Sequence, residues 1–72
     1  MKQHNVSVFE GSILEPMPNT LFRIELDSGH IIVASVAGKM RRAFLRMVPG
    51  DRVKVEMTPY DRDRGRIVYR YQ

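Results

Sequence analysis

Two stretches of alternating apolar and charged residues constrain the fold of this chain most strongly. They span residues 21–27 and 51–57. A period of two places successive side chains on opposite faces of an extended strand, so each stretch is predicted to be a strand with one buried face. The residues predicted to face the core are Phe22, Ile24, Leu26, Val53, Val55 and Met57.

Three further segments are predicted to be strands because they are rich in β-branched, aromatic and other apolar residues. They span residues 6–14, 31–36 and 66–71. Gly11 interrupts the first of them, at a place where a strand would bend or bulge. The segments predicted to be turns or loops, from their proline, glycine, asparagine and aspartate residues, are 16–19, 27–30 and 58–65.

A short helix is predicted between the third and fourth strands, in the segment that Gly38 opens and Pro49-Gly50 stops. At about 100° per residue, its basic and apolar side chains separate onto two edges. The basic edge holds Lys39, Arg42 and Arg46, and the apolar edge holds Met40, Phe44 and Met47. We expect the apolar edge to pack on the core while the basic edge faces a polyanion.

Three strands, a short helix and two more strands are the element order of an OB-fold, a five-stranded Greek-key barrel. An SH3-like barrel is the nearest alternative, and strand count alone does not exclude it. The 72 residues suffice for one small domain, and without cysteine neither a disulfide nor a thiolate metal site can stabilise it. We therefore predict an all-β protein, a single S1-like OB-fold domain over residues 1–72 with flexible ends at about 1–5 and 71–72.

The charge of the chain is concentrated in its second half. Residues 1–38 hold two basic and four acidic residues, a net charge of −2, whereas residues 39–72 hold ten basic and four acidic residues, a net charge of +6. Eight of these ten are arginine, whose planar guanidinium pairs with phosphate and stacks on bases. This composition favours nucleic acid over a membrane surface as the partner.

Neither a membrane nor an export route is indicated. No apolar run approaches the ~20 residues of a membrane span, and residues 1–5 do not lead into a signal-peptide hydrophobic block. The chain is expected to stay where it is made.

The sequence offers little support for catalysis, metal binding or a cofactor. His4 and His30 lack a second ligand at metal-binding spacing, and Asp61 and Asp63 alternate with arginines in a predicted turn, which indicates local charge balance. No Ser-His-Asp arrangement or glycine-rich phosphate loop is present. We predict that the protein is not an enzyme and has no cofactor or metal site.

The aromatic residues are predicted to be mostly structural. Phe22 and Phe44 lie on apolar faces, and Tyr69 and Tyr71 share a strand face with Ile67, which predicts core or edge packing. Recognition is therefore expected to depend on phosphate contacts and on the shape of folded RNA.

Several linked motifs resemble bacterial-type translation initiation factor one. They occur in the family's order, without gaps from about residue 6 to residue 70. The motifs are Pro18-Asn19-Thr20, Phe22-Arg23, Gly38-Lys39-Met40-Arg41, Pro49-Gly50-Asp51, Thr58-Pro59-Tyr60-Asp61 and Gly65-Arg66-Ile67-Val68.

The resemblance implies a monomeric, non-catalytic OB-fold protein of the cytoplasm, or of a plastid stroma. Such a factor binds the small ribosomal subunit at the decoding (A) site, against a 16S-type rRNA helix and a neighbouring ribosomal protein. It blocks premature tRNA binding there and assists the other initiation factors. No membrane is involved.

The resemblance also implies rRNA-binding residues in two basic regions. The first comprises Lys39, Met40, Arg41, Arg42 and Arg46, and the second comprises Tyr60, Arg64, Arg66 and Arg70. Arg64 stands where the family usually has lysine, and Phe44 where it often has tyrosine. The chain ends also depart from the family, so terminal contacts are not transferred.

Two other functions remain open from the residues alone. One is a general single-stranded RNA-binding chaperone of cold-shock type on the same fold, which would bind unstructured RNA as well as small subunits. The other is an SH3-like protein-interaction module, whose groove would be aromatic and often acidic. The basic face argues against the second.

Overall fold

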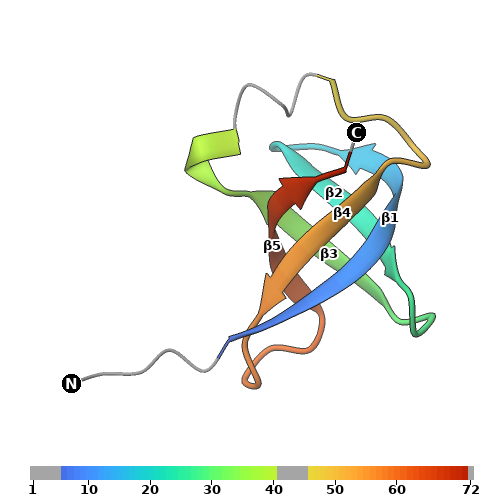
Figure 1. The fold of residues 1–72 in the computed structure, drawn as a ribbon. Coiled ribbons are helices and arrows are strands. Elements are labelled where there is room, and N and C mark those ends of the chain that lie inside the picture. Colours follow the sequence, from blue (N-terminus) through green and yellow to red (C-terminus); the bar gives the residue numbers. More distant parts are fainter. Residues whose placement is uncertain (1–5, 41–45, 72) are drawn as a thin grey trace.

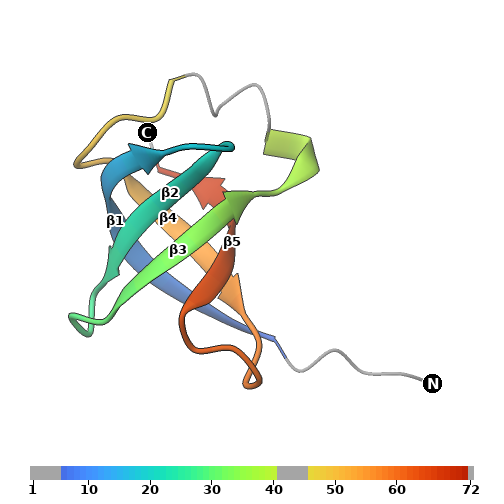
Figure 2. The ribbon, with the colours of Figure 1, turned by 180° about the vertical axis from the view of Figure 1, so that it is seen from behind.

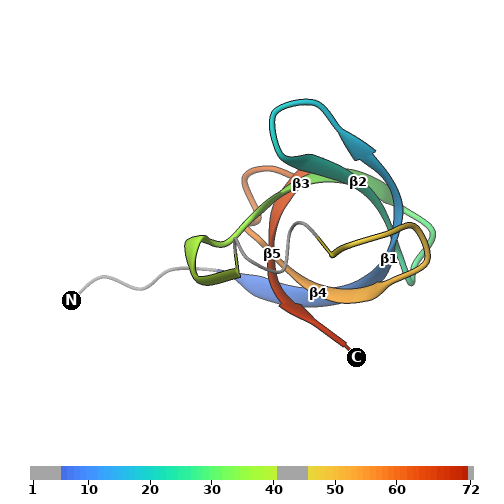
Figure 3. The ribbon, with the colours of Figure 1, turned by 90° about the horizontal axis from the view of Figure 1, so that it is seen from above.

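Five strands close into a barrel in the computed structural model, which describes residues 6–40 and 46–71 (Figure 1). The described elements are β1 (Ser7–Met17), β2 (Leu21–Leu26), β3 (Ile31–Val36), the 3₁₀ helix η1 (Gly38–Met40), β4 (Arg52–Met57) and β5 (Arg64–Arg70). Their order around the barrel is β1-β2-β3-β5-β4, with β3 and β5 parallel and the other neighbours antiparallel. The view along the barrel shows the closed ring (Figure 3). The predicted all-β OB-fold is confirmed.

β1 divides its length between two neighbouring strands, and its pairing with β4 closes the barrel. Its C-terminal part pairs with β2 and its N-terminal part with β4. Gly11 lies where the two pairings overlap, opposite Leu26 in β2 and Val53 in β4. A Cβ atom at Gly11 would lie 2.6 Å from the carbonyl oxygen of Glu25, so glycine alone permits this close approach. The pairing is regular at Gly11, and the register shift of β1 lies between Ile13 and Glu15 instead.

The core is the interior of the barrel, and the alternating stretches line it as predicted. All six residues expected to face inward are buried, with relative exposures of 0 to 7 %. The buried core cluster is Ile13, Phe22, Ile24, Leu26, Ile32, Ala34, Met47, Val53, Val55, Met57 and Ile67.

Two predicted strand boundaries are wrong. β1 continues through Pro16 to Met17, so the turn is at residues 18–20, where Asn19 and Thr20 have positive φ. Proline is tolerated because β1 pairs only with β2 beyond Ser12, which leaves an open edge for a residue without an N–H.

β5 also differs from its prediction, since it spans Arg64–Arg70 rather than residues 66–71. Arg64 and Gly65, which were expected in the loop, pair in parallel with Val33 and Ala34 of β3. A local sequence pattern does not show this pairing with a strand thirty residues away.

The predicted helix is a single 3₁₀ turn within the described residues. It comprises Gly38–Met40, and Arg46 lies in a separate turn. Residues 41–45, including Arg41, Arg42 and Phe44, lie outside the described residues. Met40 packs against the core and Met47 is buried, so these two methionines of the predicted apolar edge do face the core.

Arg52 of β4 connects to β1 and to the turn after β2 on the outside of the barrel. Its guanidinium donates two hydrogen bonds to the Asp27 carboxylate, at 2.7 and 2.8 Å, and one to Ser12 Oγ at 3.0 Å. Glu10 Oε1 lies 3.5 Å from the same guanidinium. These hydrogen bonds hold the pKa of Asp27 below its usual value and raise the pKa of Arg52.

The close packing of β5 against β4 at Gly65 can be tested by substitution of this glycine. A Cβ atom there would lie 2.5 Å from Val55 Cγ1 and 2.9 Å from the carbonyl oxygen of Glu56. We expect Gly65→Ala to lower the free energy of unfolding by about 1–3 kcal/mol, measured by denaturant titration, because the strands must move apart. Gly38→Ala is the matched control, since a Cβ atom at Gly38 meets nothing within 4 Å. Equal stabilities of the two variants would contradict the packing.

The Arg52–Asp27 pair makes stability depend on pH. Because the folded-state pKa of Asp27 lies below its ordinary value of 3.8, the pair stabilises the fold above pH 3.8, and this stabilisation is lost as the pH falls through the folded-state pKa. We therefore expect Asp27→Asn to lower the melting temperature at neutral pH, and the difference from the unmodified protein to shrink in acid.

The matched control for this change is Asp61→Asn. Asp61 Oδ1 accepts a hydrogen bond from the Asp63 N–H at 3.1 Å, which asparagine can also accept. This variant should melt like the unmodified protein at every pH. A difference between Asp27→Asn and the unmodified protein that persists unchanged into acid would contradict the assigned role of the pair.

Candidate nucleic-acid interface

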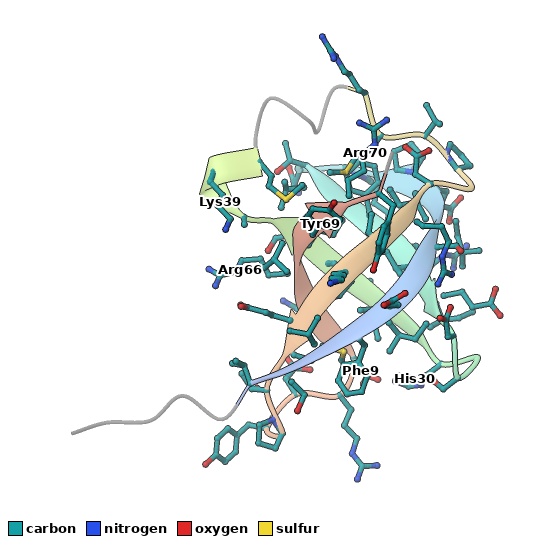
Figure 4. The ribbon with its side chains drawn as sticks, in the orientation of Figure 1. Phe9, His30, Lys39, Arg66, Tyr69 and Arg70 are labelled. Carbon is teal, nitrogen blue, oxygen red and sulfur yellow. The ribbon has the colours of Figure 1, made fainter. Side chains whose placement is uncertain are left out.

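The first basic region begins beside β5, because η1 continues directly from β3. Val36 pairs with Ile67, and the Ala37 N–H donates to the Ile67 carbonyl at 2.9 Å. The Met40 N–H then donates to the Ala37 carbonyl at 2.8 Å and closes the turn. Lys39 is exposed at this turn. Figure 4 shows Lys39 and Arg66 on the same side of the barrel.

The outer side chains along the junction of β3 and β5 form a surface that we call the β3–β5 seam. Figure 2 shows the two strands side by side, with η1 at the end of β3. Arg64 and Arg66 point outward from β5, because Gly65 between them faces the core. The β3 residues opposite them, Val33 and Ser35, are uncharged. The seam comprises Val33, Ser35, Arg64, Arg66 and, beyond the strand end, Lys39.

A hollow of about 400 Å³ lies at the β1–β2 side of this seam. Its lining combines apolar and polar side chains with one arginine. The lining includes Met17, Leu21, Val33, Ser35, Asp63 and Arg64. The seam is therefore recessed beside Arg64 rather than flat.

Tyr60 lies away from η1. It belongs to the β4–β5 loop, at the opposite end of the barrel from η1 (Figures 1 and 2), and it is 88 % exposed. The loop is held by the hydrogen bond between His30 Nε2 and the Arg62 carbonyl at 2.9 Å, and by that from the Val33 N–H to the Asp63 carbonyl at 3.0 Å. The second basic region therefore extends from the β4–β5 loop along β5, and its members Arg64 and Arg66 lie in the seam with Lys39.

Ion pairing separates the described cations of the two predicted regions into two groups. Arg66 Nη2 lies 3.0 Å from Glu56 Oε1, and Arg70 Nε lies 3.2 Å from Asp51 Oδ2. By contrast, Lys39, Arg46 and Arg64 are exposed and have no ion pair within residues 6–40 and 46–71. An exposed pair such as Arg66–Glu56 is worth about 0–1 kcal/mol, so Arg66 can exchange its partner for a phosphate.

Arg70 is a structural residue in this geometry. Its side chain is only 24 % exposed, and the Asp51 carboxylate that it contacts also accepts a hydrogen bond from the Val48 N–H at 3.1 Å. The Gly50 N–H donates to the Ile13 carbonyl at 2.8 Å in the same loop. Arg70 thus helps to fix the entry to β4, and Met40, packed on the core, helps to fix η1.

A register shift in β5 accounts for the position of Arg70 and corrects the prediction for the tyrosines. Lys54 pairs with Tyr69 and Val55 pairs with Ile67, so Val68 is an extra residue in the strand. The extra residue turns Tyr69 away from the Ile67 face, and Tyr69 is 49 % exposed rather than packed in the core. The regular alternation of strand residues, on which the prediction was based, does not reveal this bulge.

The two tyrosines and Lys54 form a group on the outer face, which we call the tyrosine step. The Tyr69 and Tyr71 rings meet edge to face with centroids 5.1 Å apart, and Lys54 Nζ lies 5.5 Å and 5.8 Å from the two centroids. The Tyr71 hydroxyl donates to Glu10 Oε2 at 3.0 Å. Desolvation of the Tyr71 hydroxyl and this contact with a carboxylate raise the pKa of Tyr71.

Tyr71, which was predicted to belong to a flexible end, is hydrogen-bonded to β4. The Tyr71 N–H donates to the Arg52 carbonyl at 2.9 Å, and residue 72 lies outside the described residues, as do residues 1–5. No helix in the described part of the chain is long and apolar enough to cross a membrane. In the same ranges, no three histidine, aspartate or glutamate side chains are grouped as metal ligands would be.

Comparison with known proteins agrees with the barrel and with the motifs. Residues 2–72 match the family described as Translation initiation factor 1A / IF-1. The solution structure of translation initiation factor one from the Wolbachia endosymbiont strain TRS of Brugia malayi is 41 % identical, with a TM-score of 0.75 over 99 % of this chain and 84 % of that one. The crystal structure of YjeQ from Thermotoga maritima is 25 % identical, with a TM-score of 0.72 over 92 % of this chain and 23 % of that one. The chain belongs to the Translation initiation factor 1A / IF-1 family and is of the bacterial type.

Proposed function

We propose that this translation initiation factor binds the small ribosomal subunit at the decoding site through rRNA contacts, blocks premature tRNA binding there and assists the other initiation factors. Its partners are then a 16S-type rRNA helix, a neighbouring ribosomal protein and the other factors. It acts as a monomer, without catalysis or a cofactor, in the cytoplasm or plastid stroma where the ribosomes are.

The observation that carries the proposal is the set of cations along the β3–β5 seam, of which Lys39 and Arg64 have no ion pair among residues 6–40 and 46–71. Lys39 and Arg64 stand at its two ends, with no acidic side chain on β3 between them. Arg66 lies between them on β5, in an exposed pair with Glu56. Unpaired cations that follow a recessed surface suit a phosphate backbone, because binding releases the counterions of the RNA.

The remaining predicted residues fall into exposed residues, residues that support the surface, and residues outside the described part of the chain. Arg46 is an exposed cation in the segment before β4, and Tyr60 offers an exposed ring in the β4–β5 loop. Met40 and Arg70 support the surface by packing and by pairing with Asp51. Arg41 and Arg42, outside the described residues, retain the rRNA-binding role that the family resemblance implies.

Substitution of the two basic residues at the ends of the seam tests its role in RNA binding. We expect Arg64→Ala to weaken binding to isolated small subunits about tenfold, because a charge-assisted hydrogen bond to phosphate is lost. The slope of log affinity against log salt should fall by about one. Lys39→Ala should act in the same way. Binding is measured by fluorescence anisotropy at several salt concentrations.

Arg62→Ala is the matched control for charge. Arg62 is exposed in the β4–β5 loop, two residues before Arg64, and its side chain lines a different hollow, with Phe9 and His30. Equal losses from Arg62→Ala and Arg64→Ala would show a general charge effect and contradict the seam. Comparable affinity of the unmodified protein for small subunits and for unstructured RNA would favour the chaperone function instead.

A further inference from the structure

The tyrosine step lies outside the seam and none of its members belongs to the predicted rRNA-binding residues. It occupies the outer face where β1, β4 and β5 run side by side. The Cα pairings place Glu10, Lys54 and Tyr69 in one row across these strands, next to the row of Val8, Glu56 and Arg66. The step therefore adjoins the seam through Arg66, and Figure 4 shows Tyr69 between Arg66 and Arg70.

The bulge at Val68 exposes Tyr69 where a regular strand would bury it. A regular strand would place Tyr69 on the face of Ile67, which is fully buried. The register shift instead leaves the Tyr69 ring half exposed on a face that also carries Lys54, the Glu56–Arg66 pair and the exposed Val8. Bulges recur in proteins at places where a side chain is re-aimed toward a binding site.

The step is also fixed in position before any partner arrives. Tyr71 is held by its hydroxyl on Glu10 and by its N–H on the Arg52 carbonyl, and its ring supports Tyr69 edge to face. The neighbouring carboxylates are already engaged, Glu10 by Tyr71 and Arg52, and Glu56 by Arg66. Lys54 supplies the charge that remains over the rings.

We propose that Tyr69 stacks on an unpaired base of the bound RNA, while Lys54 contacts the phosphate of that nucleotide. This inference rests on the proposed rRNA binding and adds a base contact to the phosphate contacts of the seam. Aromatic side chains stack on any base, so the step would recognise an unstacked nucleotide and not a sequence. Lys54, on a flexible stem, moves from the ring face to the phosphate when the base takes its place.

RNA is a better occupant than a protein surface because of the charges around the ring. Lys54 lies over the ring and Arg66 is the nearest outward cation on the same strand. An apolar protein partner would leave the Lys54 ammonium desolvated and without an anion, which is unfavourable. A nucleotide brings a π-face and an anion together.

The direct test uses a short single-stranded RNA that carries a fluorescent purine analogue among uridines. We expect the unmodified protein to quench the analogue on binding, because a tyrosine ring stacks on it. Tyr69→Phe keeps the ring and should quench equally. Tyr69→Leu should abolish the quenching and weaken binding roughly 5- to 150-fold, the range for loss of a base–aromatic stack. Equal melting temperatures of the variants establish that the fold is retained.

Small-subunit binding separates this inference from the proposed function. On small subunits Tyr69→Leu should weaken binding without changing the salt slope, whereas Lys54→Met should reduce the slope by about one. Quenching by the unmodified protein without binding to small subunits would overturn the proposed function and support the stacking. Absent quenching, or equal quenching by Tyr69→Leu, would overturn the stacking. A loss on small subunits with unchanged quenching of the RNA would also overturn it, since the ring would then contact protein.

Discussion

Closure of the barrel depends on the pairing of β1 with β4 as well as with β2, and Gly11 permits the close approach of β1 to β2 where the two pairings overlap. The Cα of Gly11 lies opposite Leu26 on one side and Val53 on the other, with the Glu25 carbonyl too close for any side chain. Closure removes most free strand edges, which a chain of 72 residues without cysteine could not cover with other elements. Arg52 strengthens the same junction from outside, through side chains of β1 and of the turn after β2.

The closed barrel also decides which cations remain available to an anionic partner. Acidic side chains neighbour Arg52 on β1 and at the end of β2, and Asp51 neighbours Arg70 at the start of β4. β3 presents no acidic side chain to β5, and Arg64 is exposed without an ion pair among residues 6–40 and 46–71. The positive charge of the described part of the second half is therefore displayed unevenly, with Arg52, Arg66 and Arg70 in ion pairs and Lys39 and Arg64 unpaired on the seam.

The sequence predicted the local features of this protein and missed those that depend on strand register. Alternation identified the buried residues of β2 and β4, and the family motifs indicated the basic regions, because each signal is contained in a few neighbouring residues. Pairing between distant segments was missed. Arg64 and Gly65 are strand only through β3, and no motif shows that Arg70 pairs with Asp51. A helix was predicted from the spacing of basic and apolar residues after Gly38. In the described residues this segment forms one 3₁₀ turn.

The bulge at Val68 links the two surfaces of the proposed RNA interface, because one unpaired residue reverses the face of every later side chain in β5. Before the bulge, Arg64 and Arg66 face outward. After it, Tyr69 faces outward and Arg70 turns toward a carboxylate at the start of β4. Without the bulge, Arg70 would carry an exposed charge and two tyrosines would have to fit a barrel end that other core side chains already fill. β5 thus presents first the arginines that we propose to contact phosphate and then the ring that we propose to stack on a base, and this order follows from the register of one strand pair.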